Sequence, residues 1–477
     1  MTLETEIVRR ALRKGVNLSP EALSFLSKFE DDELERILDS FSDRLVIGID
    51  DLLTLIHAEK SSEEIRESEE EPKSLGDLSV ILRPTGLGVR GTSEEFVKLI
   101  RLRFEKLKSI LLRRVELEPI PITELKSSAS RNGDNIVIIG MVMEKITARD
   151  KSIRMSVEDE TGSITVVFKR ESKYWELADK VPIDSVIAVR GAYVNGKIYA
   201  ESLMLPDLNN GEVEASYHEG KVVLISDVHV GSKYFNESVF ERFLKWLKSE
   251  HAIEIKYLLI CGDLVDGIGV YPNQEEELRI ADVHKQFEYA GELLSRVPER
   301  IKLIYIPGNH EPVRQAEPQN ELPRDYLETL VEANPNILHL PNPAMIKIGA
   351  VKLLLYHGRS LNALMKHIPG LQPVTPQTVV EAMSWVLRLR NLAPIYGEHP
   401  LSPEERDWLT LEEVPNVIHM GHIHVYGVGE YRSVKLINSG TFENETPYIK
   451  SLGIEVTVGK VPVLDLKNLN VELLDFS

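Results

Sequence analysis

The sequence contains very little cysteine and no long apolar run. Cys261 is the single cysteine among 477 residues, which excludes an internal disulfide and favours a reducing compartment. No uninterrupted apolar segment is long enough to cross a membrane, and the acidic first six residues show no signal-peptide pattern. We therefore expect a cytoplasmic protein without a membrane partner. Because Cys261 ends an apolar run, we also expect its thiol to be buried and unreactive.

Positive charge is also scarce. The chain has 56 Lys and Arg residues against 75 Asp and Glu residues, which gives a formal net charge of −19. This balance argues against a protein that coats nucleic acid through its overall field. A local basic groove remains open, and so does an anion site built by metal ions, because two dications place several positive charges where a phosphate would bind.

The length and composition predict several soluble globular domains. Hydrophobic residues make up 43% and charged residues 27% of the chain. We expect the following segments along the chain: a helical module at 1–57, an acidic linker and connector at 58–92, a basic helix and connector at 93–133, a small β-barrel at 134–208, and an α/β domain at 219–477.

The N-terminal module is predicted to be helical. Ser19 and Pro20 form a good helix start, since a capping hydroxyl precedes a proline at the first helical position. Apolar residues then recur at helical spacing from Leu23 to Phe29. Residues 59–71 follow with seven acidic and two basic residues and no aromatic residue, which is typical of a tether. The function of the module, interaction or packing, is left open.

A basic amphipathic helix is expected at residues 93–114. From Lys98 to Arg114 there are seven Lys and Arg residues against one Glu. This stretch could contact a phosphate backbone, and a solvated helix face is the alternative interpretation.

Residues 134–208 show the pattern of a five-stranded barrel, the number of strands in an OB-fold. A glycine in the first strand, Gly140, is followed by the turn Asp159-Glu160-Thr161-Gly162, and this pattern resembles OB-fold nucleic-acid-binding domains. Few aromatic residues occur on the strands, although stacking of bases requires them. Nucleic-acid binding and protein scaffolding therefore both remain open for the barrel. The expected strands are 136–142, 153–159, 163–168, 185–191 and 197–202.

Histidine is almost missing from the first half: of 13 histidines, only His57 precedes residue 218. Five short polar segments lie in the second half, and each follows an apolar run that is typical of a strand. These segments are Ser226-Asp227-Val228-His229, Gly262-Asp263, Gly308-Asn309-His310-Glu311, His357-Gly358 and Gly421-His422-Ile423-His424. The carboxyl ends of adjacent strands converge on one crevice in a layered α/β fold, so we expect these segments to meet.

The five segments supply carboxylate, amide and imidazole donors, the mixture that borderline divalent metals prefer. Their convergence predicts two metals about 3.5–4 Å apart that share a carboxylate. The other histidines of this region match none of the five segments, and we expect them to have surface or packing roles. They include His284, His339, His367, His399 and His419.

The motif series resembles that of the calcineurin-like metallophosphoesterases, in which every one of these elements occurs in the same order. The resemblance implies a four-layer α/β/β/α phosphoesterase domain at 219–477. It implies that Asp227, His229 and His424 hold one metal. It also implies that Asn309, His357 and His422 hold the other metal. By the same resemblance Asp263 bridges the two metals, and His310 protonates the leaving oxygen as a general acid.

Flanking residues narrow the resemblance. The stretches Val265–Pro272, Tyr356–Ser360 and Gly421–Gly427 are similar to the small subunit of archaeal family D DNA polymerase. The order of the predicted parts also matches that architecture: a helical module, a linker, a barrel and then the phosphoesterase domain. The third motif ends in Glu311, where the family commonly has Asp. This difference is a conservative departure from the family's pattern. The resemblance implies a proofreading 3′–5′ exonuclease that acts on DNA and serves as the accessory subunit of a large catalytic polymerase chain, with other replisome proteins as further candidate partners.

The donor set favours manganese, with zinc or iron as alternatives. Arg359, next to His357, is a candidate phosphate contact, and an ion pair that braces the loop is the alternative. Two other functions remain open. One is a repair nuclease or small-molecule phosphodiesterase, against which the barrel argues. The other is a scaffold with a vestigial phosphoesterase fold, against which the complete ligand set argues.

Overall fold

The computed structural model describes residues 77–127, 133, 135–209 and 218–477, together with scattered positions before residue 48. The chain divides into two compact units, Met1–Lys73 and Ser74–Ser477. In the first unit, β1 (Asn17–Leu18) pairs in parallel with β2 (Val46–Ile47). The Ser19 hydroxyl accepts a hydrogen bond from the Ala22 amide, as a helix cap would. Further residues of the expected module that the structure describes are helical, namely Ile7, Arg10, Ala11, Ala22, Leu23 and Leu26. The rest of the module, and residues 58–76 of the expected linker and connector, lie outside the described residues.

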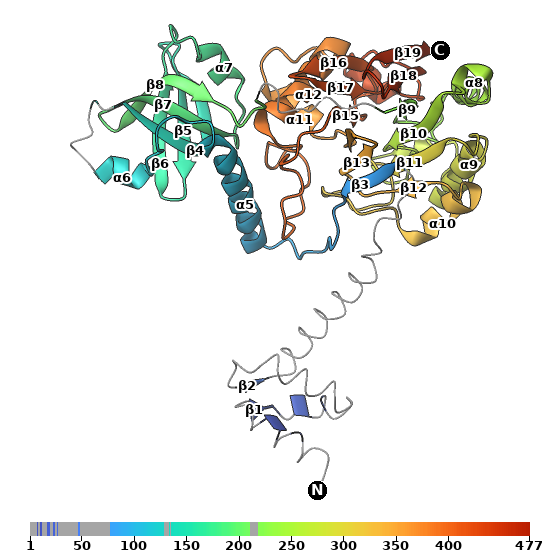
Figure 1. Ribbon diagram of the computed structural model, residues 1–477, viewed down its shortest axis with the longest axis horizontal. Coiled ribbons are helices and arrows are strands. Elements are labelled where there is room, and N and C mark those ends of the chain that lie inside the picture. Colours follow the sequence, from blue (N-terminus) through green and yellow to red (C-terminus); the bar gives the residue numbers. More distant parts are fainter. Residues whose placement is uncertain are drawn as a thin grey trace. The chain divides into compact units, whose positions relative to one another are not determined.

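The expected barrel is present as a closed sheet of five strands in the order β4-β5-β6-β8-β7 (Figure 1). Alternate residues of each strand point into the barrel, and Ile138, Val157 and Val189 are fully buried there. The assignment of this barrel as an OB-fold stays a prediction. The elements are β4 (Asn135–Thr147), β5 (Ile153–Asp159), β6 (Gly162–Phe168), α7 (Trp175–Lys180), β7 (Val186–Val194) and β8 (Lys197–Met204), preceded by α5 (Ser93–Leu112) and α6 (Ile122–Ser127).

Two six-stranded sheets form the C-terminal domain. The first sheet has the order β12-β11-β10-β9-β18-β19, and β9, β10 and β11 run parallel. Its strands are β9 (Lys221–Ile225), β10 (Ile255–Cys261), β11 (Lys302–Ile306), β12 (Leu338–His339), β18 (Lys460–Asp465) and β19 (Val471–Asp475). The second sheet has the order β16-β17-β15-β14-β13-β3. Its strands are β3 (Leu78–Leu82), β13 (Ala344–Ile348), β14 (Val351–Leu355), β15 (Val417–Met420), β16 (Gly427–Tyr431) and β17 (Val434–Asn438).

The two sheets pack face to face, and helices cover their outer faces. Strand β10 is apolar from Tyr257 to Cys261 because both of its faces are buried there. Leu258 and Ile260 pack against helices, whereas Leu259 and Cys261 face the second sheet. Helices α8 (Glu237–Leu247), α9 (Val283–Leu294) and α10 (Arg324–Ala333) cover the first sheet. Helices α11 (Leu361–His367) and α12 (Pro376–Leu389) cover the second sheet, and α13 (Pro447–Ser451) is a short surface helix.

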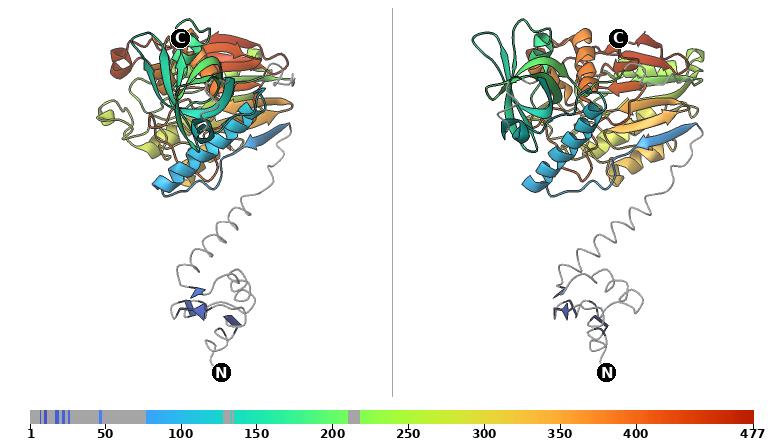
Figure 2. Two further views of the ribbon diagram at one scale, coloured as in Figure 1. Left: turned by 90° about the vertical axis from the view of Figure 1, so that its left-hand side faces the viewer. Right: turned by 60° about the vertical axis from the view of Figure 1, so that its left-hand side comes forward.

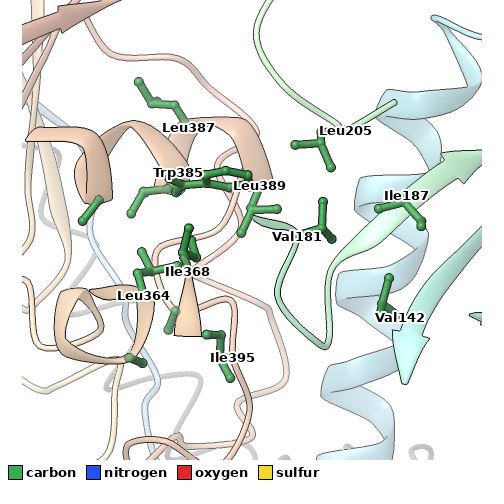
Figure 3. Packing of buried hydrophobic residues seen from close by; sticks show 14 of the residues in the cluster. Val142, Val181, Ile187, Leu205, Leu364, Ile368, Trp385, Leu387, Leu389 and Ile395 are labelled. Carbon is green, nitrogen blue, oxygen red and sulfur yellow. The ribbon is translucent and has the colours of Figure 1, made fainter. Parts of the chain in front are cut away.

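A continuous apolar cluster joins the barrel to the C-terminal domain. Val181, which follows α7 of the barrel, faces Trp385 and Leu389 of α12 in Figure 3. Helix α5 lies against the outer wall of the barrel through Phe104, Leu107 and neighbouring residues, and Figure 2 shows it beside both parts of the unit. The barrel therefore sits on the C-terminal domain through a buried apolar contact.

The strands predicted before the five motifs are confirmed. The segment 58–92, expected to be an acidic linker and connector, contains a strand that the sequence did not indicate. Leu78–Leu82 forms β3 and pairs antiparallel with β13 at the edge of the second sheet. The five residues are apolar at four positions, but no alternation or turn signal marked them as a strand. Among the described residues, no helix is long and apolar enough to span a membrane.

Candidate metal centre

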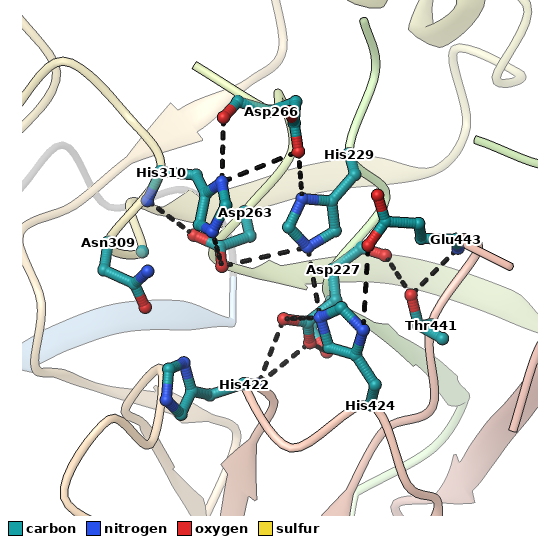
Figure 4. A network of polar contacts seen from close by, with 12 residues as sticks. Asp227, His229, Asp263, Asp266, Asn309, His310, His422, His424, Thr441 and Glu443 are labelled. Carbon is teal, nitrogen blue, oxygen red and sulfur yellow. Dashed lines mark hydrogen bonds and ion pairs between the residues drawn. The ribbon is translucent and has the colours of Figure 1, made fainter. Parts of the chain in front are cut away.

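All seven predicted ligands lie at the carboxyl ends of strands from the two facing sheets. In chain order they follow β9 (Asp227, His229), β10 (Asp263), β11 (Asn309), β14 (His357) and β15 (His422, His424). Figure 4 shows the residues of the first sheet and those that follow β15 converging on one space. The structure thus brings together every residue of the predicted set.

Several of these residues adopt an unusual backbone conformation. Asp227, His229, Asp263, His422 and His424 all have φ between 52° and 67°. Residues other than glycine rarely adopt this left-handed region. Each such conformation costs about 1–3 kcal/mol and persists only where the surrounding structure imposes it. The strand ends are therefore bent sharply to aim these side chains into one site.

Two glycines allow the loops to approach closely. A Cβ atom at Gly308 would lie 2.3 Å from Oδ1 of Asp263, and one at Gly421 would lie 2.4 Å from Oδ2 of Asp227. Any larger residue at either position would displace a candidate ligand. This requirement explains why glycine begins the third and fifth motifs.

The first group of donors consists of Asp227, His229 and His424. The Nε2 atom of His424 lies 3.4 Å from Oδ1 of Asp227 and 3.1 Å from Nε2 of His229. The side chains are buried, with exposures of 0–9%. Asp227 also accepts from the backbone amide of His422, which ties the loop after β9 to the loop after β15.

The second group consists of Asp263, Asn309, His357 and His422. The Nε2 atom of His357 lies 3.1 Å from Oδ2 of Asp263 and 3.1 Å from Oδ1 of Asn309. Oδ2 of Asp263 is also 3.9 Å from Nε2 of His229, so Asp263 stands between the two groups. This position is the one expected of a bridging carboxylate. Asp263, His357 and His422 can place one donor atom each within 4.8 Å of the others.

The hydrogen bonds of the imidazoles orient their Nε2 atoms toward one space that suits a cation. Nδ1 of His229 donates to Asp266 and Nδ1 of His357 donates to the carbonyl of Cys261, both at 2.9 Å. In the neutral rings, both Nε2 atoms are then acceptors. Each Nε2 atom faces further acceptors, which is unfavourable unless a positive charge lies among them. Such orientation by a hydrogen bond to the other ring nitrogen is usual for histidines that bind metals.

The pKa shifts indicate that negative charge is concentrated in the site. Burial lowers the pKa of His357, but Asp263 outweighs it and raises that pKa to about 10. Burial would raise the pKa of Asp263, but His357 and His310 hold it well below its usual range. A proton on His357 therefore occupies the place that a divalent cation would take, and metal binding would release it.

His310 lies beside the two groups and is half-buried. Its backbone amide donates to Oδ1 of Asp263, and its Nδ1 lies 2.8 Å from the carbonyl oxygen of Asp266. This contact leaves Nε2 directed toward the site, 4.0 Å from Oδ2 of Asp263. His310 can therefore present one ring nitrogen to a substrate without being held as a ligand.

Three carboxylates of the site were not assigned a role by sequence reasoning. Asp266 orients His229, and the buried side chain of Gln274 donates to Asp266. Glu311 accepts hydrogen bonds from three backbone amides. Glu443 accepts from Ser232 and approaches Nδ1 of His424 at 3.9 Å. The sequence offered a signal for Asp266, three residues after Asp263, but none for Glu443.

Arg359 does not reach the candidate ligands among the described contacts. Its guanidinium donates to the carbonyl and the side-chain oxygen of Gln315, and Gln315 in turn donates to the carbonyl of Asn309. This arrangement resembles the loop-bracing alternative, although the partner is an amide rather than an acid. Phosphate contact by Arg359 stays a prediction.

The remaining histidines and Cys261 have packing or surface contacts. His419 is fully buried and contacts Ser439, and burial lowers its pKa to about 3. His399 contacts Glu317, and His284 stacks on Tyr326. Cys261 is buried, and burial raises the pKa of its thiol, so the prediction of an unreactive thiol agrees with its surroundings.

The fold and the donor set together define an α/β protein with a candidate metal centre between two sheets. The model of the family described as the B subunits of DNA polymerases alpha and epsilon matches residues 222–426. The DNA polymerase II small subunit of Archaeoglobus fulgidus is 36% identical over 481 residues, which cover 96% of this chain and 95% of that protein. The corresponding protein of Methanothermobacter thermautotrophicus is 37% identical, over 81% of this chain and 80% of that protein.

The chain therefore belongs to the family of archaeal DNA polymerase II small subunits, the family D small subunits that the motifs predict. A solved structure described as a novel archaeal phosphodiesterase is 12% identical, covers 53% of this chain and 98% of that one, and has a TM-score of 0.29. A zinc complex of Vps29 from Entamoeba histolytica is 14% identical and has a TM-score of 0.28. The match covers 54% of this chain and 99% of that one. Both resemblances are distant and extend over about half of the chain.

Proposed function

We propose that this chain is a metal-dependent 3′–5′ DNA exonuclease that proofreads for a family D polymerase and serves as its accessory subunit. The observation that carries the proposal is the convergence of all seven candidate ligands and His310 on one site. The sharp backbone bends and the opposed acceptor atoms support a site built for cations. Relatives of this chain are named as small subunits, which supports a large partner chain.

The donor set fits two divalent ions. Asp227, His229 and His424 would hold one ion. Asn309, His357 and His422 would hold the other, with Asp263 between them. Manganese suits this mixture of oxygen and imidazole donors, and zinc or iron are the alternatives. Two such ions would supply an activated water and would neutralise charge that builds on the phosphoryl oxygens.

The protein's own residues would orient the scissile phosphodiester and handle its protons. Asp266 and the carbonyl of Cys261 keep His229 and His357 in the tautomers that point Nε2 into the site. His310, held by Asp263 and by the carbonyl of Asp266, would give a proton to the leaving 3′ oxygen. Removal of one mononucleotide would then leave a new 3′ hydroxyl on the primer strand.

The surface also offers a place for a large partner chain. An exposed apolar seam, Val97, Met143, Ile183 and Tyr396, follows the junction of α5, the barrel and the C-terminal domain. The segments that carry these side chains are linked through neighbouring residues. Phe96, next to Val97, contacts the ring of Tyr396, and the amide of Tyr396 donates to Asp184, next to Ile183. The amide of Asp184 in turn donates to the carbonyl of Val142, next to Met143. Exposed apolar side chains that gather at one place mark interaction sites. We assign this seam to the large polymerase subunit.

Digestion of single-stranded DNA labelled at either end, with manganese, tests the proposed function. Wild-type protein should shorten the strand from its 3′ end, and His310→Ala should slow this by about 100-fold to 10,000-fold. Because His310 is not a proposed ligand, the variant should keep the metal content of the wild type. Shortening from the 5′ end would contradict the proposal. So would absence of cleavage both with and without the large subunit.

A further inference from the structure

The basic helix is the obvious candidate for contact with DNA, but the structure uses several of its cations internally. Arg103 is buried and forms an ion pair with Asp407, and Lys106 pairs with Glu412. Lys108 pairs with Glu105 and Glu160. Helix α5 thus joins the barrel to the C-terminal domain, and these three cations already have carboxylate partners in place of phosphates.

A second cationic stretch lies on the barrel, between β6 and α7. Residues 169–175 read Lys-Arg-Glu-Ser-Lys-Tyr-Trp, with Glu171 as the only acid. Each of the three cations lies over an aromatic ring: Lys169 over Tyr199 at 5.6 Å, Arg170 over Trp175 at 3.9 Å, and Lys173 over Tyr174 at 5.0 Å. We name this set of six residues the cation–aromatic patch.

The patch is accessible and its charges are not neutralised. Lys169, Arg170 and Lys173 are exposed, and their rings are partly buried. Within the described part of the chain, none of the three cations forms an ion pair. The barrel, residues 135–209, has ten basic and eleven acidic residues, whereas the whole chain carries a charge of −19. The barrel is therefore nearly neutral within an otherwise acidic protein, so its net charge repels a polyanion only weakly.

The rings are held in place by the fold. The indole nitrogen of Trp175 donates to the carbonyl of Lys151 at 2.8 Å, which fixes the ring against the loop between β4 and β5. Tyr199 lies on the outer face of β8, in register with Val167 of β6, which pairs with Arg154 of β5. A ring that is already fixed loses little conformational entropy when a base stacks on it.

A hollow adjoins the patch. A cavity of about 260 Å³ lies on the outer wall of the barrel and is lined by Tyr174 of the patch together with Arg190, Ser202 and residues that follow α5. The cavity thus combines an aromatic ring, cationic side chains and one acid, Glu116, with an apolar floor. It extends the surface on which a flexible strand could lie.

We propose that the cation–aromatic patch binds single-stranded DNA. Alternating cations and rings suit a polymer of phosphates and bases, because cations contact the backbone and the rings stack with unpaired bases. Duplex DNA would hide its bases from the rings, so the geometry favours a single strand. This inference goes beyond the proposed nuclease and does not depend on the metal centre.

The test measures binding of a fluorescently labelled single strand of about 20 nucleotides to the full chain in EDTA, so that no cleavage occurs. A triple variant, Lys169→Ala with Arg170→Ala and Lys173→Ala, should bind at least about tenfold more weakly. It should also reduce the slope of log affinity against log salt by about 2, because each lost phosphate contact contributes about 0.7. A second variant, Tyr199→Leu, should weaken binding without changing that slope.

The matched control removes three exposed cations of the C-terminal domain that form no ion pair with a described residue, Lys245→Ala with Lys248→Ala and Lys285→Ala. It should bind the strand as the wild type does. Unchanged thermal unfolding of the patch variant shows that the barrel remains intact. Wild-type hydrolysis of a small chromogenic phosphodiester by that variant separates this inference from the proposed nuclease.

Three results would overturn the inference. The first is no measurable binding of the strand by wild-type protein at about 50 mM salt. The second is an equal effect of the patch variant and the control variant. The third is normal DNA binding by the patch variant combined with loss of the large polymerase subunit, which would make the patch a protein interface.

Discussion

Among single residues, Glu311 shows how much of the site depends on groups that contact no substrate. Its buried carboxylate accepts hydrogen bonds from the amides of Asp263, Leu264 and Gly308, at 2.7–3.0 Å. It thereby joins the loops after β10 and β11. Burial and the neighbouring Asp263 raise the pKa of Glu311 to about 7. The three amide donors require an acceptor at this place.

Replacement of Glu311 by alanine should therefore lower stability. Three buried amides would lose their partner, at about 1–3 kcal/mol each, so the free energy of unfolding should fall by at least about 3 kcal/mol. Denaturant unfolding measures this change. Glu292→Ala removes an exposed acid of α9 and should alter stability by less than about 0.5 kcal/mol. An equally small effect of Glu311→Ala would contradict the structural role.

The sequence located the donors of the site but not the groups that orient them. Motif order and the preceding apolar runs were sufficient to predict that Asp227, Asp263 and His357 would meet. Glu443 could not be found in this way, because its place beside His424 depends on how distant loops fold back on the site. Asp266 lay within a recognised stretch, but its hydrogen bond to His229 is a tertiary contact that spacing does not encode.

At the level of elements, the structure changes the interpretation of α5 that the sequence suggested. The pattern predicted the helix, and the structure has it at Ser93–Leu112 with a capping box at Thr92. Periodicity shows which face is apolar, but it does not show what a basic residue contacts. Arg103 lies on the buried face, where its partner Asp407 comes from a loop more than three hundred residues later in the chain.

Arg103→Met should destabilise the unit by about 3–5 kcal/mol, because it leaves Asp407 buried without its cation. The side chains of Arg103 and Asp407 are only 7% and 1% exposed. Arg101→Met, on the exposed face of the same helix, is the matched control and should have little effect. Both values follow from denaturant unfolding at neutral pH, and similar values for the two variants would show that the ion pair does not stabilise the unit.

The same pair predicts a dependence of stability on pH. Burial would raise the pKa of Asp407, but Arg103 outweighs burial and lowers it. The folded pKa therefore lies below the unfolded value of about 3.9. Wild type should therefore have a higher free energy of unfolding than Asp407→Asn. This difference should be at its full size above about pH 4 and should disappear as the pH falls through the folded pKa of Asp407. Unfolding of both proteins across the acidic range measures this, and a difference that grows toward low pH would contradict the assignment.

At the scale of the whole molecule, a buried apolar cluster joins the barrel to the C-terminal domain, and the partner surface that we propose crosses their junction. The exposed seam of Val97, Met143, Ile183 and Tyr396 draws on segments far apart in the chain, so no local pattern could reveal it. Strand β3 is a similar case, because it joins the second sheet from before the barrel. The sequence predicted the two folded parts, whereas their contact surface emerges only from the assembled unit.

Charge placed in the seam should weaken capture of the large polymerase subunit. Met143→Glu combined with Ile183→Glu should reduce the affinity at least about tenfold, because buried charge without a partner is costly at an interface. Ile253→Glu combined with Leu473→Glu, at exposed positions elsewhere, should leave capture unchanged. Binding of the purified variants to surface-immobilised large subunit measures this affinity. Equal capture by both double variants would show that the partner docks at another surface.

The most direct test of the central claim is the metal content of the purified chain after manganese loading, measured by elemental analysis. We expect two ions per chain for the wild type and for His310→Ala. We expect the loss of at least one ion for Asp263→Ala, because Asp263 stands between both donor groups at 3.1 Å from His357 and 3.9 Å from His229. Wild-type protein that holds no ion, or Asp263→Ala that holds two, would contradict the metal centre on which the proposed nuclease rests.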